Sequence, residues 1–241
     1  MDPSRKAVWE AIEKMRRKSL APVDTMGCDQ LYLCDSSPVD KRFQILASLM
    51  LSSQTKDEVT AEATRKLFSR APSATNLSGM MEKDIEELIY PVSFYKRKAI
   101  YLKKASELIL ERHQGDIPQD VEGLCELPGV GPKMAHLTMQ AAWGRCQGIA
   151  VDVHVHRICK RLAWTQDAKT PEDTRKQLEA WLPREFWPRI NHLLVGFGQT
   201  VCTARAPDCE ECLARRHCPF GKMASREIEE GQCGVGVKIN K

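Results

Sequence analysis

Four cysteines near the C-terminal end constrain this chain more than any other feature. They lie within seventeen residues with the spacing C-x6-C-x2-C-x5-C, at Cys202, Cys209, Cys212 and Cys218. Thiolates this close in sequence can converge on one inorganic centre, either a metal ion or an iron-sulfur cluster. The sequence therefore predicts a compact segment folded around a bound cofactor.

The rest of the chain has none of the patterns of a secreted or membrane protein. The other cysteines are scattered without a disulfide framework, and the N-terminus does not resemble a secretion signal. No stretch approaches the ~20 apolar residues of a membrane span. We therefore expect an intracellular protein with reduced thiols and no membrane anchor.

Local charge is more informative than overall charge. The chain has 36 Lys and Arg against 32 Asp and Glu, a formal net charge of +4. Two basic clusters lie within it, and each is typical either of a phosphate-binding face or of a solvated helix surface. They consist of Lys96, Arg97, Lys98, Lys103 and Lys104, and of Arg157, Lys160 and Arg161.

Apolar periodicity predicts helices almost throughout, and strand alternation is nowhere sustained. The predicted fold class is therefore all-α. Thr55 is predicted to cap one helix, and Pro188 either kinks another helix or marks its start. From Gly221 onward the periodicity is lost, so residues 221–241 are predicted to form a weakly ordered tail. In chain order, the predicted helices are one that contains Val8 and Ile12, one that begins near Asp40, one that follows Thr55, one over residues 96–113, one over residues 132–143, one that contains Val155 and Ile158, one over residues 171–182 and one over residues 185–198.

The segment LPGVGPKMA, residues 127–135, predicts a tight turn before a helix. Gly129 and Gly131 allow the backbone to turn sharply and to approach a partner closely, and the first amides of the next helix have no partner within that helix. A phosphate oxygen fits such a helix N-terminus. An ordinary connection between two helices would also use glycine here. The dinucleotide-binding fingerprint is excluded, because the third glycine and the βαβ pattern are missing.

Lys133 and Asp152 are candidate catalytic groups on either side of one helix. A partly desolvated amine near a helix N-terminus loses its proton more readily and can act as a nucleophile, whereas most lysines are solvated surface charges. Asp152 is either an ordinary N-cap or a catalytic carboxylate. The intervening helix rises ~20 Å and the following ~8 residues can span ~26 Å, so the chain can bring the two groups together.

Taken in order, LPGVGPK, GIAVDVHVHR and the four cysteines resemble the endonuclease III family of DNA glycosylases with lyase activity, and most of all its eukaryotic members. The resemblance covers about residues 4–220. It implies two helical domains with a DNA-binding cleft between them. Residues 36–145 would form a helix-hairpin-helix six-helix domain, and residues 1–35 and 146–220 an iron-sulfur cluster domain, followed by the 221–241 tail.

The resemblance also assigns roles to individual residues. Lys133 and Asp152 would be the catalytic pair, and the four cysteines would bind a 4Fe-4S cluster. Gln54 would fill the gap left by an extruded nucleotide, and Phe94 would intercalate as a wedge. Without the resemblance, Gln54 reads as a helix-terminus residue and Phe94 as part of the core. The hairpin backbone that would bind DNA phosphate consists of Gly129, Val130 and Gly131.

The implied activity is excision of oxidised pyrimidines from duplex DNA, followed by strand cleavage through a Schiff base on Lys133. The partners would be double-stranded DNA with oxidised pyrimidines or abasic sites, and downstream repair proteins. The location would be the nucleus or the mitochondrion in a eukaryote. Two alternatives stay open. One is a monofunctional mismatch glycosylase of the same superfamily, which usually lacks a lysine at position 133. The other is a non-catalytic helix-hairpin-helix DNA-binding protein with a four-cysteine zinc site.

Three features call for separate interpretation. Val153 stands where the family often has threonine, which removes a hydroxyl beside Asp152. The loop over residues 203–208 has Arg205 as its one basic residue, so we expect no strong phosphate contact there. His154 and His156 either line the cleft or satisfy core hydrogen bonds, and the core interpretation is favoured for His156.

Overall fold

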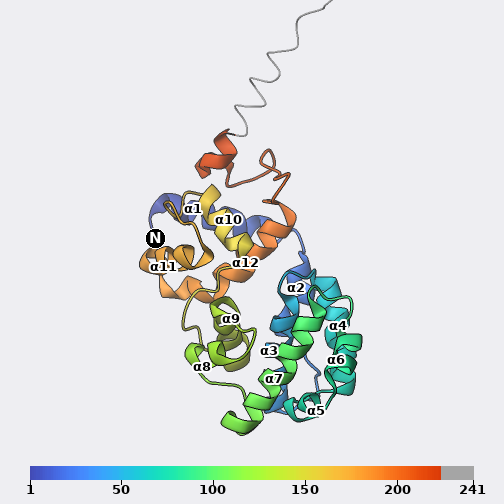
Figure 1. The fold of residues 1–241 in the computed structure, drawn as a ribbon. Coiled ribbons are helices and arrows are strands. Elements are labelled where there is room, and N and C mark those ends of the chain that lie inside the picture. Colours follow the sequence, from blue (N-terminus) through green and yellow to red (C-terminus); the bar gives the residue numbers. More distant parts are fainter. Residues whose placement is uncertain (224–241) are drawn as a thin grey trace, which may run out of the picture. The chain divides into compact units, whose positions relative to one another are not determined.

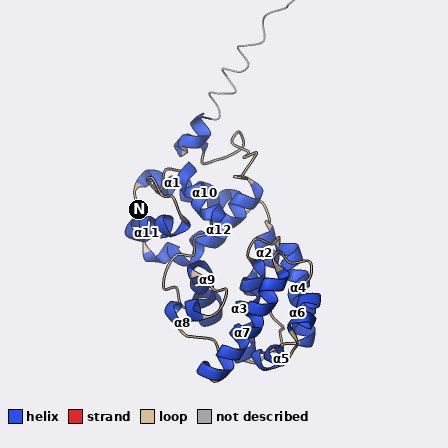
Figure 2. Cartoon of the chain, in the orientation of Figure 1, coloured by secondary structure: helices blue, strands red, loops and turns tan. Residues whose placement is uncertain are grey.

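Helices are the only regular secondary structure in the described part of this protein. The computed structural model describes residues 1–223, and over these residues it contains helices, turns and loops but no strand (Figure 2). The all-α prediction is therefore confirmed. None of the helices within residues 1–223 is long and apolar enough to cross a membrane.

The chain divides into two compact units (Figure 1). We call Pro22–Ala150 the hairpin unit, and Met1–Ala21 together with the chain from Val151 onward the discontinuous unit. Residues 22–35 and 146–150, which the resemblance assigns to the cluster domain, thus belong to the hairpin unit. One reason is that two buried side chains, Gln44 and Ser48, are hydrogen-bonded to residues 31–33. Leu33 N–H donates to the Gln44 amide oxygen, and the Ser48 hydroxyl donates to the Leu31 carbonyl.

The hairpin unit is built around one helix, α3 (Pro38–Ser52), in which every residue from Phe43 to Leu51 is buried. A helix that is apolar on all sides must be covered on all sides. α3 packs against α4, α7 and α9. The remaining elements complete the cover. In chain order the unit contains α2 (Pro22–Met26), η1 (Cys28–Gln30), α3, α4 (Asp57–Arg70), α5 (Ala74–Ser78), α6 (Glu82–Ile89), α7 (Tyr95–His113), α8 (Val121–Glu126) and α9 (Pro132–Trp143).

The discontinuous unit has α12 at its centre, packed against α10 and α1. The predicted apolar stripe of the first helix is confirmed, since Val8 and Ile12 are buried. Pro188 lies in the first turn of α12, where proline is tolerated, so it marks the start of that helix and does not kink it. The elements are α1 (Pro3–Arg16), α10 (Val153–Arg161), α11 (Pro171–Trp181), η2 (Arg184–Phe186), α12 (Trp187–Thr200) and η3 (Arg215–His217).

Most predicted helix bounds agree with the structure, but the predicted cap at Thr55 is wrong. The N-cap of α4 is Lys56, and no side chain caps that helix. The Thr55 hydroxyl instead accepts hydrogen bonds from Ser93 N–H, at 3.2 Å, and from Lys98 Nζ, at 3.3 Å. The hydroxyl also donates to the nearby Ser53 carbonyl at 3.2 Å, but the two groups that donate to it lie about forty residues away, and a prediction of a local cap does not include such contacts.

The turn between α8 and α9 uses its two glycines differently. Gly129 has a left-handed φ of +82°, and a Cβ built on it would lie 2.5 Å from the Cδ2 atom of Tyr101 in α7. Val130 N–H closes the turn by donating to the Leu127 carbonyl at 3.1 Å. Gly131 is the N-cap of α9 in an extended conformation, with open space where a side chain would be. Only Gly129 is therefore required by conformation and packing.

The prediction of a weakly ordered tail is wrong for its first three residues. Residues 221–223 are helical, and residues 224–241, including Cys233, lie outside the described part of the chain.

The two glycines make a matched pair of variants. We expect Gly129→Ala to lower the free energy of unfolding by about 1–3 kcal/mol, because alanine would adopt a left-handed φ against the Tyr101 ring. Gly131→Ala should cost less than about 1 kcal/mol, the scale of a changed N-cap. Urea unfolding of both variants measures the difference. Equal losses would contradict this account of the turn.

Candidate functional site

Two exposed side chains of the hairpin unit have an uncommon backbone conformation. Gln54 follows the end of α3 with φ +54°, and Phe94 is the N-cap of α7 with φ +57° and is 55% exposed. A left-handed φ is rare for a bulky side chain and persists where the surrounding structure imposes it. The interpretation of Phe94 as a core residue is therefore wrong. Both side chains are presented to solvent.

A hydrogen-bonded cluster joins the two loops that carry these residues. Lys98, in the first turns of α7, is only 6% exposed. Its Nζ donates to the Leu51 and Ser53 carbonyls, each at 2.6 Å, and to the Thr55 hydroxyl. Burial lowers the pKa of Lys98 to about 8. The Gln54 loop and the start of α7 are thus connected through one ammonium group.

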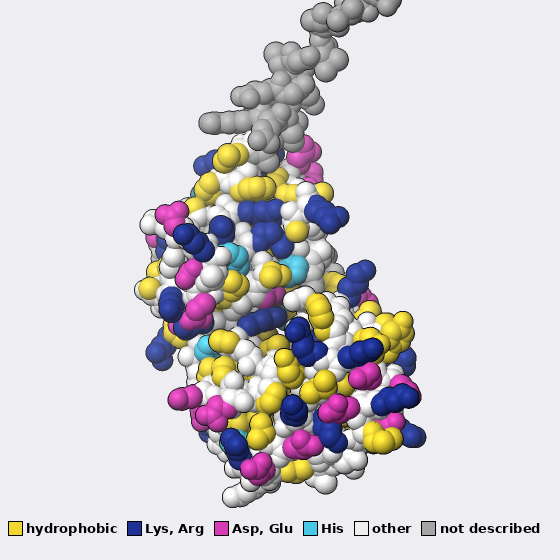
Figure 3. Space-filling view, in the orientation of Figure 1, with side chains coloured by type: hydrophobic (Ala, Val, Ile, Leu, Met, Phe, Trp, Pro, Cys, Tyr) yellow, Lys and Arg dark blue, Asp and Glu magenta, His cyan; other side chains and the backbone are white. Residues whose placement is uncertain are grey.

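The first basic cluster does not present all its charges to solvent. Lys98 is buried, and Lys103 Nζ donates to the Ser78 carbonyl at 3.0 Å and to the Met80 carbonyl at 2.6 Å. The interpretation of the cluster as a phosphate-binding face is therefore wrong for these two lysines. Arg97 is exposed and lies over the Phe94 ring, 5.3 Å from its centre. On the face drawn in Figure 3, basic and acidic side chains are interspersed over the hairpin unit.

Lys133 is the second residue of α9, and α9 packs along α3. Its side chain is half-buried and forms no salt bridge within residues 1–223. Burial raises the pKa of Cys28 to about 11, and the charges acting on this thiol include Asp57 and Lys133. Lys133 therefore shares one region of the hairpin unit with the segment that follows α3. No side chain caps α9, so its first amides are available to a ligand.

Asp152 lies in the discontinuous unit, directly before α10. Its Oδ1 accepts a hydrogen bond from Val155 N–H at 2.8 Å, so the aspartate is a true N-cap. A carboxylate has further lone pairs beyond the one that this bond uses. The side chain is half-buried, and the next residue, Val153, is 68% exposed. The capping role fixes where the carboxylate lies and leaves it able to act on a ligand.

The four cysteines line one pocket of the discontinuous unit, together with apolar side chains such as Phe197 and Phe220. Burial, together with the charges of Cys218, Cys202 and Cys209, raises the pKa of Cys212 to about 11. Thiolates that repel one another in this way need a positive centre to coexist. Within residues 1–223, no group of three or more His, Cys, Asp or Glu side chains is arranged to hold a single metal ion.

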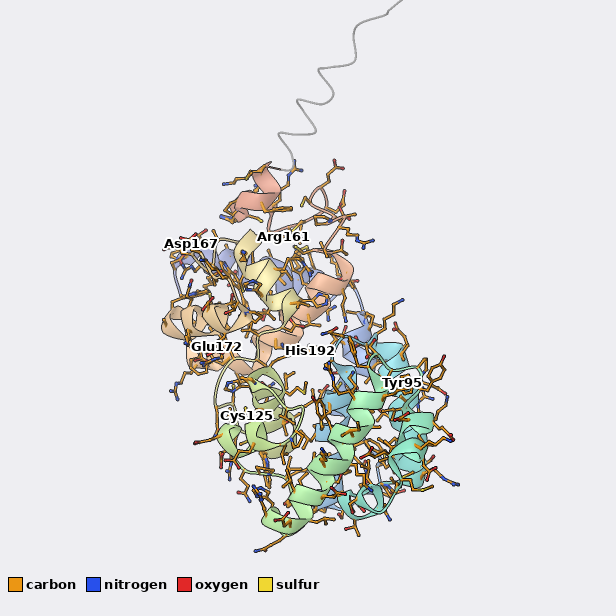
Figure 4. All side chains as sticks on the ribbon, in the orientation of Figure 1. Tyr95, Cys125, Arg161, Asp167, Glu172 and His192 are labelled. Carbon is orange, nitrogen blue, oxygen red and sulfur yellow. The ribbon has the colours of Figure 1, made fainter. Side chains whose placement is uncertain are left out.

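Arginines of α10 hold the cysteine segment in place. Arg161 (Figure 4) donates to Cys202 Sγ at 3.2 Å and to the Thr203 carbonyl at 2.7 Å. Arg157 donates to the Cys202 carbonyl at 2.9 Å. The interpretation of the second basic cluster as a phosphate-binding face is therefore wrong for these two arginines. A further donor, Gly221 N–H, lies 3.3 Å from Cys218 Sγ, so both ends of the segment offer hydrogen bonds to sulfur.

The histidines after Asp152 belong to the packing of the discontinuous unit. His156 Nδ1 is hydrogen-bonded to the Thr174 hydroxyl at 2.7 Å, and burial lowers the pKa of this histidine. The half-buried His156 thus satisfies a hydrogen bond inside the discontinuous unit, which agrees with the favoured interpretation. His154 Nδ1 lies 3.3 Å from the Arg157 guanidinium.

Sequence reasoning missed Cys28, Lys98 and the two arginines as parts of these sites. Lys98 stands among four other basic residues, and residue type does not distinguish it from them. The only distinguishing signal is its four-residue spacing from Phe94, which places Lys98 about one helical turn further along α7. Arg161 gives no local signal at all, since the groups it contacts lie about forty residues away.

Comparison with known proteins identifies the family of this chain. Residues 47–184 match the HhH-GPD superfamily of base excision DNA repair proteins. The chain is 48% identical over 228 residues to endonuclease III-like protein 1 of Mus musculus, covering 90% of this chain and 76% of that protein. The Bos taurus protein of the same name is 51% identical over 212 residues, covering 88% of this chain and 70% of that protein.

Among solved structures, a trapped covalent intermediate of endonuclease III with DNA superposes with a TM-score of 0.80 and 26% identity. The superposition covers 94% of this chain and 100% of that chain. The chain therefore belongs to the endonuclease III family, within the HhH-GPD superfamily of base excision DNA repair proteins.

Proposed function

We propose that this chain is a bifunctional DNA glycosylase and abasic-site lyase that removes oxidised pyrimidines from duplex DNA. The observation that supports this most directly is the position of Lys133, a half-buried lysine without a salt bridge in the described residues, at the start of the hairpin helix. An amine in such a place is available for attack on a sugar carbon.

The first step is extrusion of the damaged nucleotide, because a glycosidic bond inside stacked duplex cannot be reached. Phe94 inserts between base steps, as apolar wedges do, and Gln54 occupies the gap. Both side chains are exposed and project from adjacent, hydrogen-bonded loops, which suits joint insertion. The uncapped N-terminus of α9, after Gly129, Val130 and Gly131, binds backbone phosphate without reading sequence.

The chemistry follows from the two groups that the resemblance pairs. Neutral Lys133 attacks C1′ of the deoxyribose, the glycosidic bond breaks, and the base leaves with its electron pair and takes up a proton. The attached amine then loses one proton, the C1′–O4′ bond breaks, and O4′ takes up a proton, which opens the sugar ring and leaves a protonated imine. This imine makes the C2′ proton acidic, and removal of that proton expels the 3′ phosphate by β-elimination. Asp152 stabilises positive charge that develops on the sugar and helps to transfer the lysine proton. This mechanism requires both residues to act on the same sugar.

The four cysteines fit a 4Fe-4S cluster. They line one pocket, their thiolates need a compensating positive centre, and Arg161 and Gly221 offer hydrogen bonds to sulfur. A zinc ion would need four sulfurs about 2.3 Å from one point, whereas a four-iron cluster is bound at four separate irons. When bound, the cluster would stabilise the fold and take no part in the bond-breaking steps. Nuclear or mitochondrial location and downstream repair partners stay predictions.

Replacing the nucleophile tests the proposed activity. With DNA that contains an oxidised pyrimidine, borohydride should trap wild-type protein covalently, and Lys133→Gln should lower trapping and strand cleavage at least about a hundredfold. Lys66→Gln, an exposed lysine of α4, is the matched control and should behave as wild type. Base release by wild type without any trapping would favour the monofunctional alternative. A wild-type protein that binds DNA but neither releases base nor is trapped would favour the non-catalytic DNA-binding alternative.

Two substitutions separate the capping role of Asp152 from its catalytic role. Asparagine caps helices as well as aspartate, so Asp152→Asn should change stability by less than about 0.5 kcal/mol, whereas Asp152→Ala should cost ~1 kcal/mol. Both should lower the single-turnover excision rate by ~10²–10⁴-fold, because both remove the charge. Thermal unfolding and excision kinetics measure the two effects. Full activity in Asp152→Asn would leave the residue with a structural role only.

Metal analysis tests the assignment of the cysteines. Purified protein should be brown and contain about four irons per chain, and Cys212→Ala should lose colour and iron together. Cys34→Ala, an exposed cysteine of the hairpin unit, should keep both. A colourless protein with about one zinc per chain would contradict the cluster assignment.

A further inference from the structure

Lys98 has a hydrogen-bond arrangement that an ordinary surface lysine does not need. Its ammonium has three N–H donors, and three oxygen acceptors surround it: the Leu51 and Ser53 carbonyls and the Thr55 hydroxyl. It forms no salt bridge in the part of the chain that the structure describes. All three acceptors lie at or just beyond the end of α3, where backbone carbonyls lack helical partners.

Lys98 is also connected, through its backbone, to the loop that carries Phe94. Lys98 N–H donates to the Phe94 carbonyl at 3.0 Å, which forms the first turn of α7. Thr55 adds a second connection, because its hydroxyl also accepts from Ser93 N–H. A displacement of one loop would therefore break hydrogen bonds to the other.

The energetics explain why a restraint is needed here. Gln54 and Phe94 both have left-handed backbones, which such residues do not adopt without support. Burying an ammonium without a carboxylate is costly, but three oxygen acceptors and the negative end of the α3 dipole offset that cost. A side chain without donors would remove the buried hydrogen bond to the Leu51 carbonyl and leave the Ser53 carbonyl with the Thr55 hydroxyl as its remaining side-chain donor.

We propose that Lys98 is a positioning residue for base extrusion, which holds the Gln54 and Phe94 loops together in the conformation that enters DNA. This inference rests on the proposed function, and it adds a residue that touches neither the base nor the sugar. The competing interpretation is a lysine that only stabilises the fold. Lys103 is such a lysine, since it donates to two backbone carbonyls of the 78–80 segment, away from both loops.

The experiment compares Lys98→Met with Lys103→Met. Each change removes an ammonium of the same helix from two carbonyl acceptors, so both are expected to lower the melting temperature. Only Lys98→Met should slow excision from lesion-containing duplex, by about tenfold to a hundredfold, the effect of a small misplacement of functional groups. Borohydride trapping on a single-stranded abasic oligonucleotide needs no wedge, and it should change by less than about twofold in either variant.

A binding measurement makes the test independent of turnover. In a Lys133→Gln background, 2-aminopurine opposite a tetrahydrofuran abasic analogue should brighten on saturation with protein, because the wedge unstacks it. Lys98→Met should reduce that rise, and Lys103→Met should not.

Thr55→Val and Thr55→Ser provide a second test if Lys98→Met does not fold. The valine variant removes the hydroxyl that connects the loops, and the serine variant keeps it. Slowed duplex excision in Thr55→Val, restored in Thr55→Ser, supports the inference.

Two outcomes lead to different conclusions. If wild type excises lesions and Lys98→Met and Lys103→Met behave alike in every duplex measurement, the positioning role is overturned and the proposed function stands. If wild type neither excises, traps nor brightens the probe, the proposed function fails, and the positioning role fails with it.

Discussion

The complete burial of α3 from Phe43 to Leu51 is the constraint on which the hairpin unit depends. A helical stretch with no solvated face must be enclosed, and the helices that enclose α3 include α7 and α9. α9 carries Lys133, α7 begins at Phe94, and the end of α3 itself leads into Gln54. The three elements that carry candidate DNA-contacting and reacting groups are therefore fixed by one hydrophobic core. Rigid support of this kind is what a site needs to hold its groups in productive geometry.

Two lysines of this unit show how surroundings decide the role of a residue type. Lys98 is buried with its three donors satisfied by three oxygen atoms, so it can position loops but has no free electron pair or donor for a substrate. Lys133 is half-buried without a salt bridge in the described residues. Surroundings decide the role of Arg161 as well. Its guanidinium donates hydrogen bonds to the cysteine segment, so these donors are not available to bind phosphate.

Much of the fold could be predicted from the sequence, because helix periodicity and helix ends are local. The glycine turn followed by Pro132 predicted the helix that is α9 (Pro132–Trp143), and the lysine-rich segment predicted α7. The roles of Thr55, Lys98 and Arg161 could not be predicted. Apart from the local bond of Thr55 to the Ser53 carbonyl, their partners come from segments roughly forty residues away, and neither periodicity nor residue type predicts such contacts. The same limit applies to Phe94, whose exposure depends on its backbone conformation and not on its hydrophobicity.

The central claim is that one amine of the hairpin helix forms the covalent intermediate. The most direct test is mass spectrometry of the borohydride-reduced adduct between wild-type protein and lesion-containing duplex, after proteolysis and nuclease digestion. The account predicts a single modified peptide with the reduced sugar on Nζ of Lys133. A sugar located on Lys98, on the N-terminal amine or on several lysines at similar levels would contradict it.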